Sequence, residues 1–421
     1  AIRAIIVGNE VMLRGEQTDK ALAAKAQRVK AATGLPVTIA DIWAFWLKHP
    51  ELAKSVDFIT IHILPYWEDD PQPISRLQPL LDDIVGRVNA VFPHTKFLIG
   101  ETGWPSLGRT RGWSVPSLIN QARFIREFVA LAADRGWDYN LIEAYDQPWK
   151  RHLEGTVGGA WGLLYPDGSP KFPFTGPVST NPNWKKDALV SLALGGVGLL
   201  AFLLRPPRRL LAAARTGILL PFLGTIVVLG AEFVLAASVR PAHWAIWGFD
   251  LILTLIGAGL LLIMMAYERR VEPTPLAPVL NCLQRPWQYK VTPSLLLGLF
   301  QVTVIFMVGV LTLALSFDNR SRDIPLAVMA VPVLACCLMV RAYSNNHNMA
   351  LLRPEAWLGG FLIVTGIMSV ASEEAGNTEA YLWALLVFLT AAPLWLRVRQ
   401  AMISAAEPTG LSRSKSLMRQ S

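Results

Sequence analysis

Cysteine is scarce in this chain, and the few cysteines lie late in the sequence. Cys282, Cys336 and Cys337 are the three cysteines among 421 residues, and all of them follow Trp184. A disulfide framework therefore cannot stabilise the first part of the chain. That part needs a sizeable hydrophobic core of its own.

Metal-ligand and nucleotide-binding motifs are also missing. The six histidines show no metal-ligand spacing along the sequence, and the glycine-rich stretch 155–159 lacks the strand-to-helix context of a phosphate loop. Residues 284–287 resemble the Gln-x-x-Arg-Trp motif of processive membrane glycosyltransferases, but the spacing differs and no Asp-x-Asp motif is present. We interpret them as a basic interfacial loop, and we predict neither a metal nor a cofactor.

Long apolar runs are absent before Trp184 and dominate after it. Hydrophobic residues make up 52% of the chain and its mean hydropathy is +0.37, both too high for an ordinary soluble protein. Because about 20 apolar residues cross a bilayer as a helix, we predict an all-α transmembrane domain at 184–400. Its seven expected spans lie at 188–204, 217–238, 244–266, 294–316, 324–340, 356–371 and 379–396.

Positive charge is sparse in one set of the connections between these spans. That set holds only Arg240, Arg320 and Arg322, whereas the other set holds fifteen basic residues. Basic residues favour the cytoplasmic side, so we predict that residues before Ala188 lie outside and that 401–421 form a basic cytoplasmic tail. The fifteen are Arg205, Arg208, Arg209, Arg215, Arg269, Arg270, Arg285, Lys290, Arg341, Arg353, Arg397, Arg399, Arg413, Lys415 and Arg419.

The formal charge of +8 then reflects membrane topology. We accordingly predict a lipid bilayer as a partner and no nucleic acid. Two acidic residues interrupt the spans, Glu232 and Asp250, each roughly 9 Å deep at a rise of about 1.5 Å per residue. Since ionisable groups at such depth are usually functional, we hypothesise a polar contact between them; the alternative is that both side chains reach the headgroup region.

Apolar strands alternate with amphipathic helices in residues 1–183. We predict strands at 2–7, 37–40, 58–64, 96–100 and 139–144, and helices at 18–32, 41–54, 74–91 and 115–135. This alternation is typical of a parallel α/β sheet that is buried on both faces. A closed (β/α)8 TIM barrel needs eight strands, so the sheet is either open or completed by three further β/α units.

The start of the chain suggests where those units would be. The chain begins without Met, runs at once into an apolar strand and shows no signal peptide. A domain that lies outside the membrane must have been exported. We therefore expect an upstream signal or anchor helix followed by the three missing units.

Polar and aromatic side chains follow the ends of several predicted strands, as they do at the catalytic rim of a barrel. Glu10 ends the strand Ile-Ile-Val-Gly-Asn-Glu, and Glu101 ends the strand Phe-Leu-Ile-Gly-Glu. Glycoside hydrolysis requires such a pair, one carboxylic acid to protonate the leaving oxygen and one carboxylate to attack the anomeric carbon. Taken singly, a glutamate after a strand is more often solvated or ion-paired.

The residues around both carboxylates carry a more specific signal. Val7–Glu10 and Gly100–Pro105 resemble the acid/base and nucleophile signatures of glycoside hydrolase family 17. Leu64–Trp67 stands where that family has Tyr-Pro-Tyr-Phe, and the segments from Tyr145 and Trp161 are similar to its closing segment. These motifs follow the family's order and cover about residues 1–175.

The resemblance implies a (β/α)8 barrel whose acid/base ends strand four and whose nucleophile ends strand seven. Glu10 would then be the general acid/base and Glu101 the nucleophile, and strands one to three would be absent here. Asn9 would bond the sugar 2-hydroxyl, as the asparagine before the acid/base does in that clan. Three positions depart from plant members of the family: His62, Leu64 and Gln147.

Further candidates for sugar binding are aromatic or polar residues near strand ends. Aromatic rings can stack on pyranose faces or simply pack in the core, and both interpretations stay open for the tryptophans. Tyr66 could steady the nucleophile through its hydroxyl, whereas Asp146 and Lys150 could bind sugar hydroxyls or pair with each other. The substrate-binding candidates are Asn9, Tyr66, Trp67, Trp104, Tyr145, Asp146, Trp149, Lys150 and Trp161.

A barrel joined to a multi-span membrane domain is similar to membrane-bound bacterial members of family 17, described as β-(1,6)-glucan synthases or β-1,3-glucan transglycosylases. The resemblance implies a retaining transglycosylase on β-1,3-linked glucan, in the bacterial inner membrane and facing the periplasm, with a glucan synthase as a further partner. The alternatives are a β-1,3-glucan endohydrolase and a non-catalytic glucan-binding membrane subunit. The presence of both carboxylates disfavours a binding module.

The predicted topology can be checked with reporter fusions. A reporter active only outside the cytoplasm should work when fused after Pro166, and a cytoplasm-only reporter should work after Arg419, because the basic loops hold their side of the membrane inside. Alkaline phosphatase activity and green fluorescent protein fluorescence in whole cells measure the two signals. Reversal of both signals would contradict the predicted orientation.

Overall fold

The computed structural model describes residues 2–204, 210–238, 241–267, 271–317, 322–340, 343 and 349–406. The chain divides into two compact units, the first made of Ala1–Pro182 with Glu374–Asn377 and the second of Asn183–Glu373 with Thr378–Ser421. Part of the predicted tail, 407–421, and several predicted loop residues, among them Arg240, Arg269 and Arg320, lie outside the described residues.

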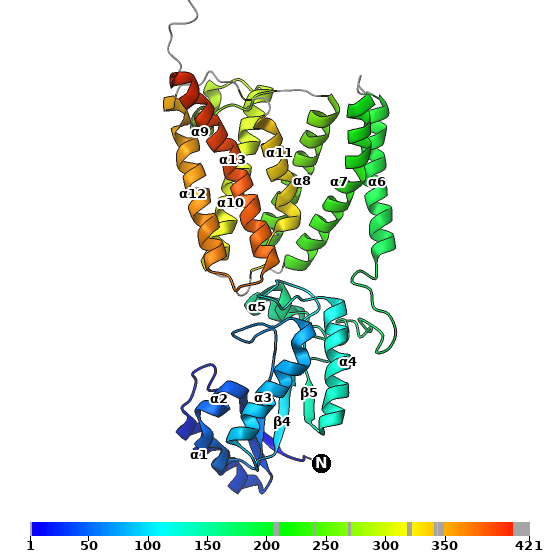
Figure 1. The fold of residues 1–421 in the computed structure, drawn as a ribbon, viewed down its shortest axis with the longest axis vertical. Helices are drawn as coiled ribbons and strands as arrows, with labels where there is room; N and C mark the ends of the chain where they lie inside the picture. Colours follow the sequence, from blue (N-terminus) through cyan, green and yellow to red (C-terminus); the bar gives the residue numbers. More distant parts are fainter. Residues whose placement is uncertain are drawn as a thin grey trace, which may run out of the picture. The chain divides into compact units, whose positions relative to one another are not determined.

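The first unit is built on a five-stranded sheet in which every neighbouring pair of strands is parallel (Figure 1). The strands follow one another in chain order, so each pairs with the next. The predicted parallel α/β architecture is thereby confirmed. The strands are β1 (Ile5–Asn9), β2 (Val37–Ile42), β3 (Ile59–His62), β4 (Phe97–Thr102) and β5 (Asp138–Leu141).

Helices join consecutive strands, and local sequence sets where they begin and end. Thr18 accepts a hydrogen bond from the Ala21 amide at the start of α1 (Asp19–Thr33), and Gly34 ends that helix with φ of 65°. Ser117 caps α4 (Leu118–Arg135) in the same way. The other helices of this unit are α2 (Trp43–Lys48), α3 (Leu77–Val91) and α5 (Arg151–Gly158), with 3-10 turns η1 (Pro50–Ser55), η2 (Ile74–Arg76) and η3 (Pro148–Lys150).

The single helix predicted at 41–54 is wrong. Asp41 belongs to β2, and the helical stretch that follows divides into α2 and η1. Pro50 explains the division, because proline has no amide proton to continue the α-helical ladder and disfavours helical backbone in the residue before it.

The central strands are buried on both faces, whereas the two outer strands are not. Every residue of β3 is buried, and so are the first five residues of β2. By contrast, β1 and β5 each pair with a neighbour on one side only among the described residues, and three of the four residues of β5 are exposed. The sheet of the first unit is therefore open at both edges.

Close packing between β3 and β4 depends on a glycine. A Cβ added at Gly100 would lie 2.3 Å from the Thr60 methyl carbon and 3.2 Å from the His62 ring. Real Cβ contacts are not that short, so Thr60 and His62 occupy the space that any side chain at position 100 would need.

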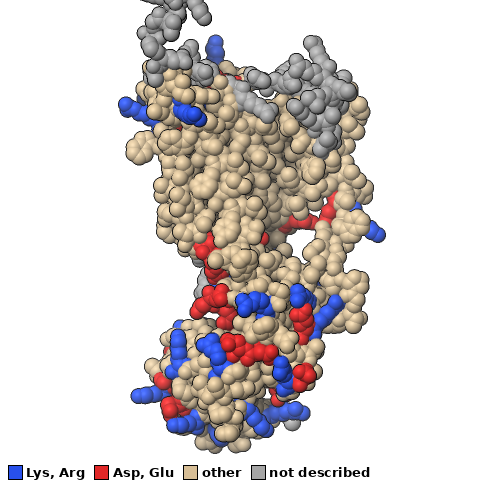
Figure 2. All heavy atoms as spheres, in the orientation of Figure 1, with Lys and Arg blue, Asp and Glu red and all other residues tan. Residues whose placement is uncertain are grey.

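The second unit is helical. Among the described residues, five helical stretches are long and apolar enough to cross a membrane: Leu219–Ala237 of α7 (Leu210–Ala237), Ala242–Met265 of α8 (Pro241–Tyr267), α10 (Pro293–Phe317), Met349–Ala371 with α12 (Arg353–Ala371), and Thr378–Ala405 of α13 (Thr378–Ala406). The spans predicted at 188–204 and 324–340 correspond to α6 (Trp184–Leu204) and to the shorter α11 (Leu326–Met339). On the face shown in Figure 2, the described helices present mainly uncharged side chains, with charged ones near the ends.

Acidic side chains in this unit have different partners from those predicted. Glu232 faces Asp187 of α6, and Asp250 is fully buried, with no hydrogen bond to either carboxylate oxygen within the described residues. The predicted contact between Glu232 and Asp250 is thus wrong.

A buried ion pair links the last two long helices. Glu355 of α12 lies 3.5 Å from Arg397 of α13, and neither side chain is more than 1% exposed. The same two side chains also hold the backbone before α9 (Leu276–Gln284). Glu355 accepts from the Leu276 amide at 2.8 Å, and Arg397 donates to the Pro273 carbonyl at 2.9 Å.

Alanine substitutions at two glycines, one in the sheet and one on a helix, test the packing of the sheet. Gly100→Ala should destabilise the first unit by about 1–3 kcal/mol, because the new methyl group overpacks the β3–β4 contact. Gly86→Ala is the matched control: it lies on an exposed part of α3 with open space around it, and alanine should there add up to about 1 kcal/mol of stability. Denaturant unfolding of the detergent-solubilised chain, followed by tryptophan fluorescence, measures both; equal effects would refute the packing argument.

Candidate active site

The loop after β1 presents Glu10 in an unusual backbone conformation. Glu10 has φ of 51°, the left-handed region that residues other than glycine seldom adopt, and its amide donates to the Ala40 carbonyl at 2.8 Å. Asp41, buried at the end of β2, accepts from the Met12 amide at 3.0 Å. The neighbouring strand therefore fixes the turn that carries Glu10.

His62 stands between the two predicted catalytic carboxylates. Its Nδ1 atom lies 3.0 Å from Glu10 Oε1 and 3.9 Å from Glu101 Oε2, and the histidine side chain is 1% exposed. One oxygen of each glutamate and this nitrogen all lie within 4.8 Å of one another. The register explains the grouping, since His62 pairs with Glu101 across β3 and β4.

The remaining oxygens of both carboxylates face other side chains. Asn9 donates to Glu101 Oε1 at 3.4 Å, and the Arg14 guanidinium lies 3.9 Å from Glu10 Oε2. Arg14 also donates to the Asn9 carbonyl at 2.6 Å. Each glutamate is thus held on one side, while its other oxygen is directed toward His62.

The surroundings shift the pKa values of the two glutamates in opposite directions. The hydrogen bond from His62 holds the pKa of Glu10 below its usual value, against the effect of burial. Burial raises the pKa of Glu101, and the negative charge of Glu10 adds to that rise. The surroundings therefore favour the charged form of Glu10 more than the charged form of Glu101.

Two further acidic residues lie close by that the sequence did not single out. Glu143 accepts from Lys150 at 2.8 and 2.9 Å and from the Gln147 amide. Burial raises the pKa of Glu154, which also senses the charges of Lys150 and of Glu143, Glu10 and Glu101. The family-like segment beginning at Tyr145 pointed to this region, but no sequence pattern identified the two glutamates.

Asp146 and Lys150 do not pair with each other. Asp146 instead bonds to Lys171 at 2.8 Å and accepts from the Gly162 amide at 2.9 Å. Lys171 is almost fully buried, and desolvation lowers its pKa. Asp146 and Lys171 thus form a local ion pair, whereas Lys150 is committed to Glu143.

The aromatic candidates divide between core and surface. Tyr66, Trp104 and Trp161 are buried; the Tyr66 hydroxyl donates to the Arg109 carbonyl at 2.7 Å and the Trp104 indole donates to the Val115 carbonyl at 3.1 Å. Trp149 is 62% exposed and Tyr145 is 50% exposed. Partly buried Trp67 stacks on Trp161, their ring centres 6.4 Å apart. Trp149 and Tyr145 are therefore the accessible rings.

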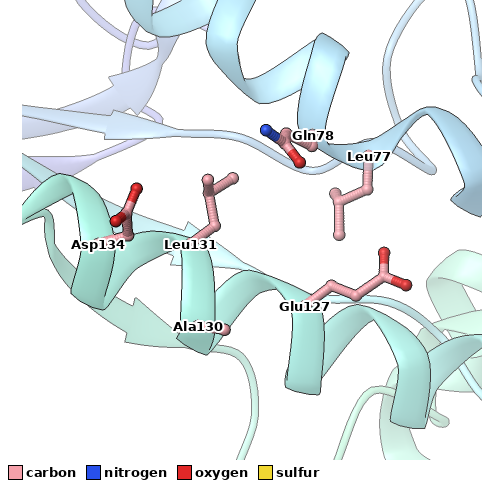
Figure 3. A pocket seen from close by; sticks show the side chains of 6 residues that line it. All are labelled: Leu77, Gln78, Glu127, Ala130, Leu131 and Asp134. Atoms are coloured by element: carbon pink, nitrogen blue, oxygen red, sulfur yellow. The ribbon is translucent and has the colours of Figure 1, made fainter.

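A pocket of about 360 Å³ lies elsewhere in the first unit, between α3 and α4 (Figure 3). Figure 3 shows Leu77 and Gln78 on one wall and Leu131 with two acidic side chains on the other. No strand-end residue lines it. Its lining residues are Leu77, Gln78, Glu127, Ala130, Leu131 and Asp134.

Comparison with known proteins identifies the first unit. Residues 1–162 match the family model of the BtgE/BtgC glycoside hydrolase domain. A similar stretch is 27% identical over 172 residues to a probable family 17 glucosidase of Saccharomyces cerevisiae, an alignment that covers 39% of this chain and 43% of that relative. This part of the chain is similar to proteins of glycoside hydrolase family 17. The predicted family is confirmed.

Other relatives are also fungal proteins. A glucan 1,3-beta-glucosidase of Arthroderma benhamiae is 29% identical over 188 residues, covering 41% of this chain and 60% of that relative. A solved β-1,3-glucanosyltransferase of family 17 from Rhizomucor miehei is 30% identical, with a TM-score of 0.36, and the match covers 40% of this chain and 62% of that one. The chain spans about three fifths of the length of such relatives.

Proposed function

We propose that the chain is a retaining β-glucan transglycosylase that acts on β-1,3-linked glucan. The spacing of the two glutamates supports this most directly, because their nearest oxygens lie within 4.8 Å of each other. Retaining glycosidases hold their carboxyl groups at about 5–5.5 Å, whereas inverting enzymes leave about 6.5–9.5 Å for a water molecule. The names of the family 17 relatives supply the substrate class.

The reaction follows from these positions. Glu101 attacks the anomeric carbon while the protonated Glu10 gives its proton to the departing glycosidic oxygen, so a covalent glycosyl-enzyme forms as the linkage breaks. Glu10 then takes the proton from an incoming sugar hydroxyl, which attacks the same carbon and releases Glu101. With water in place of the sugar, the same steps give hydrolysis.

The first step needs a protonated Glu10 and an ionised Glu101. In the free site the pKa of Glu10 is lowered and that of Glu101 is raised, so the bound sugar has to act against both shifts. An electron-poor anomeric carbon beside Glu101 stabilises its anionic form, and a glycosidic oxygen beside Glu10 offers that residue a partner for its proton. The bound sugar therefore brings the site into its reactive charge state.

The binding surface combines exposed rings and polar groups. Trp149 and Tyr145 present accessible faces on which pyranose rings can stack. Asn9, which is exposed and hydrogen-bonded to Glu101, is placed beside the nucleophile, where family 17 members bind the 2-hydroxyl. The ion pair of Lys150 and Glu143 adds polar groups beside Trp149, whereas Tyr66, Trp104 and Trp161 are buried and pack in the core.

We also propose that three β/α units precede β1 and close the sheet into a (β/α)8 barrel. The open edges at β1 and β5 support this, since each leaves backbone groups without a neighbouring strand. Exposed apolar side chains on or beside both strands also support the proposal. They are Ile2, Ile6 and Tyr139.

The membrane helices give the enzyme its proposed setting. The five long apolar helices and the basic loops support a multi-pass protein of the bacterial inner membrane whose catalytic unit faces the periplasm. A glucan synthase in the same membrane would supply the chains that are remodelled. The alternative activity is endohydrolysis of β-1,3-glucan, which uses the same two carboxylates.

Removal of each carboxylate should have a different result. Glu101→Ala should lower kcat on every substrate by at least about 10³-fold, because the covalent intermediate is lost. Glu10→Ala should lose about 10²–10⁴-fold on oligosaccharides but far less on an activated aryl glycoside, and azide should restore turnover with a β-azide product. Assays with both substrates measure this, and Glu51→Ala, an exposed acid on η1, is the control. Equal losses on both substrates in the two variants would contradict the assigned roles.

The fate of the intermediate separates the two activities. Incubated with β-1,3-oligosaccharides, the wild type should form longer or branched products faster than it releases reducing ends, because a bound sugar gains a high effective concentration over water at about 55 M. Trp149→Ala should shift the products toward hydrolysis, and Trp149→Phe, which keeps an aromatic face, should not. Mass spectrometry measures the ratio of transglycosylation to hydrolysis products. If only shorter oligosaccharides form at all substrate concentrations, the transglycosylase is rejected and the endohydrolase remains.

A further inference from the structure

Glu10, His62 and Glu101 bring three potential metal-ligand atoms together, each within 4.8 Å of the others. Zinc binds histidine nitrogen and carboxylate oxygen at about 2.0–2.2 Å, so two ligands of a tetrahedral ion lie about 3.3–3.5 Å apart. The His62 nitrogen lies 3.0 Å from one glutamate oxygen and 3.9 Å from the other, and the three atoms stay within 4.8 Å. For these ligands to reach the distances of the ion, the two nitrogen–oxygen separations have to change by about 0.3–0.6 Å, and the two glutamate oxygens have to approach each other by up to about 1.5 Å.

The groups around these ligands orient them for that role. Asn9 bonds to the Glu101 oxygen that faces away from His62, and Arg14 lies next to the corresponding oxygen of Glu10. Such outer contacts fix the direction of a carboxylate and are typical of metal sites. One oxygen of each glutamate is therefore left to point at the same place as the His62 nitrogen.

Burial gives the three ligands different freedom. His62 is 1% exposed and packs against Gly100, so its ring is held in place. The glutamate side chains are 22% and 28% exposed, so an ion can enter from solvent and keep a water molecule at its fourth position. The histidine is thus a fixed ligand, and the glutamates close around the ion.

We propose that Glu10, His62 and Glu101 bind a divalent ion of the zinc class and that this ion excludes the sugar. Two carboxylates and a neutral imidazole balance a doubly charged ion, and one nitrogen with two oxygens is a common zinc set. Magnesium is a poorer fit, because it prefers six oxygen ligands in near-ideal octahedral geometry. The exclusion rests on the proposed function, since the ion would take the oxygens that attack the sugar and protonate its leaving group.

Binding is measured first without any sugar. Titration of Zn²⁺ into the detergent-solubilised, chelator-treated full chain should show one site by calorimetry, and Mg²⁺ should give no heat. His62→Asn and Glu101→Gln, both close in shape to the natural side chains, should each weaken Zn²⁺ binding by at least about 100-fold, because each removes a direct ligand, while loss of an outer contact alone costs about 10–100-fold.

A second histidine–carboxylate pair provides the control. His49 lies 3.3 Å from Asp19 at the surface of the first unit, and the described residues offer it no third ligand. His49→Asn should leave Zn²⁺ binding unchanged, and melting curves confirm that each variant is folded. Wild-type protein that binds no Zn²⁺, or folded His62→Asn protein that binds it as tightly as wild type, would overturn the proposal.

Competition then tests the exclusion. In the wild type, Zn²⁺ should raise the apparent KM for β-1,3-oligosaccharides without lowering kcat, and a chelator should reverse the effect. Turnover in chelator together with no Zn²⁺ binding would overturn the metal site and leave the proposed function standing. Zn²⁺ binding without turnover of any glucan would overturn the function and leave the metal site standing.

Discussion

The alignment of parallel strands is the constraint on which the proposed site depends. Glu10, His62 and Glu101 are far apart in sequence, and they meet because three strands of one sheet end at the same level. The pairing of His62 with Glu101 and the hydrogen bond from the Glu10 amide to Ala40 set that level. A register shift of one residue would turn the side chains of a strand to its other face and separate the group.

Several acidic groups lie at the same edge of the sheet, where their negative charges repel one another. The charge of Glu10 acts on Glu101, and Glu154 senses the charges of Glu143, Glu10 and Glu101. Lys150 compensates for Glu143, and His62 lies between Glu10 and Glu101. Negative charges so placed disfavour one another, so these neighbouring positive groups stabilise the site.

The sequence predicted the five strands, because apolar runs report on burial, and it predicted Glu10 and Glu101 at strand ends, where the structure has them; their catalytic roles stay a prediction. It did not predict Glu143 as the partner of Lys150, or Lys171 as the partner of Asp146. Both pairs depend on how loops fold over the strand ends, which no periodic pattern encodes. The grouping of Glu10, His62 and Glu101 was missed for a related reason: His62 and Glu101 come from β3 and β4, Glu10 comes from the loop after β1, and the three have no common spacing in the chain.

The buried pair of Glu355 and Arg397 bears on how the last two long helices hold together. Glu355 lies near the start of α12 and Arg397 near the end of α13, and the two charges neutralise each other there. These two helices are consecutive and joined by the short segment 372–377. The helical hairpin is therefore fastened at both ends, by the connecting segment at one and by the ion pair at the other.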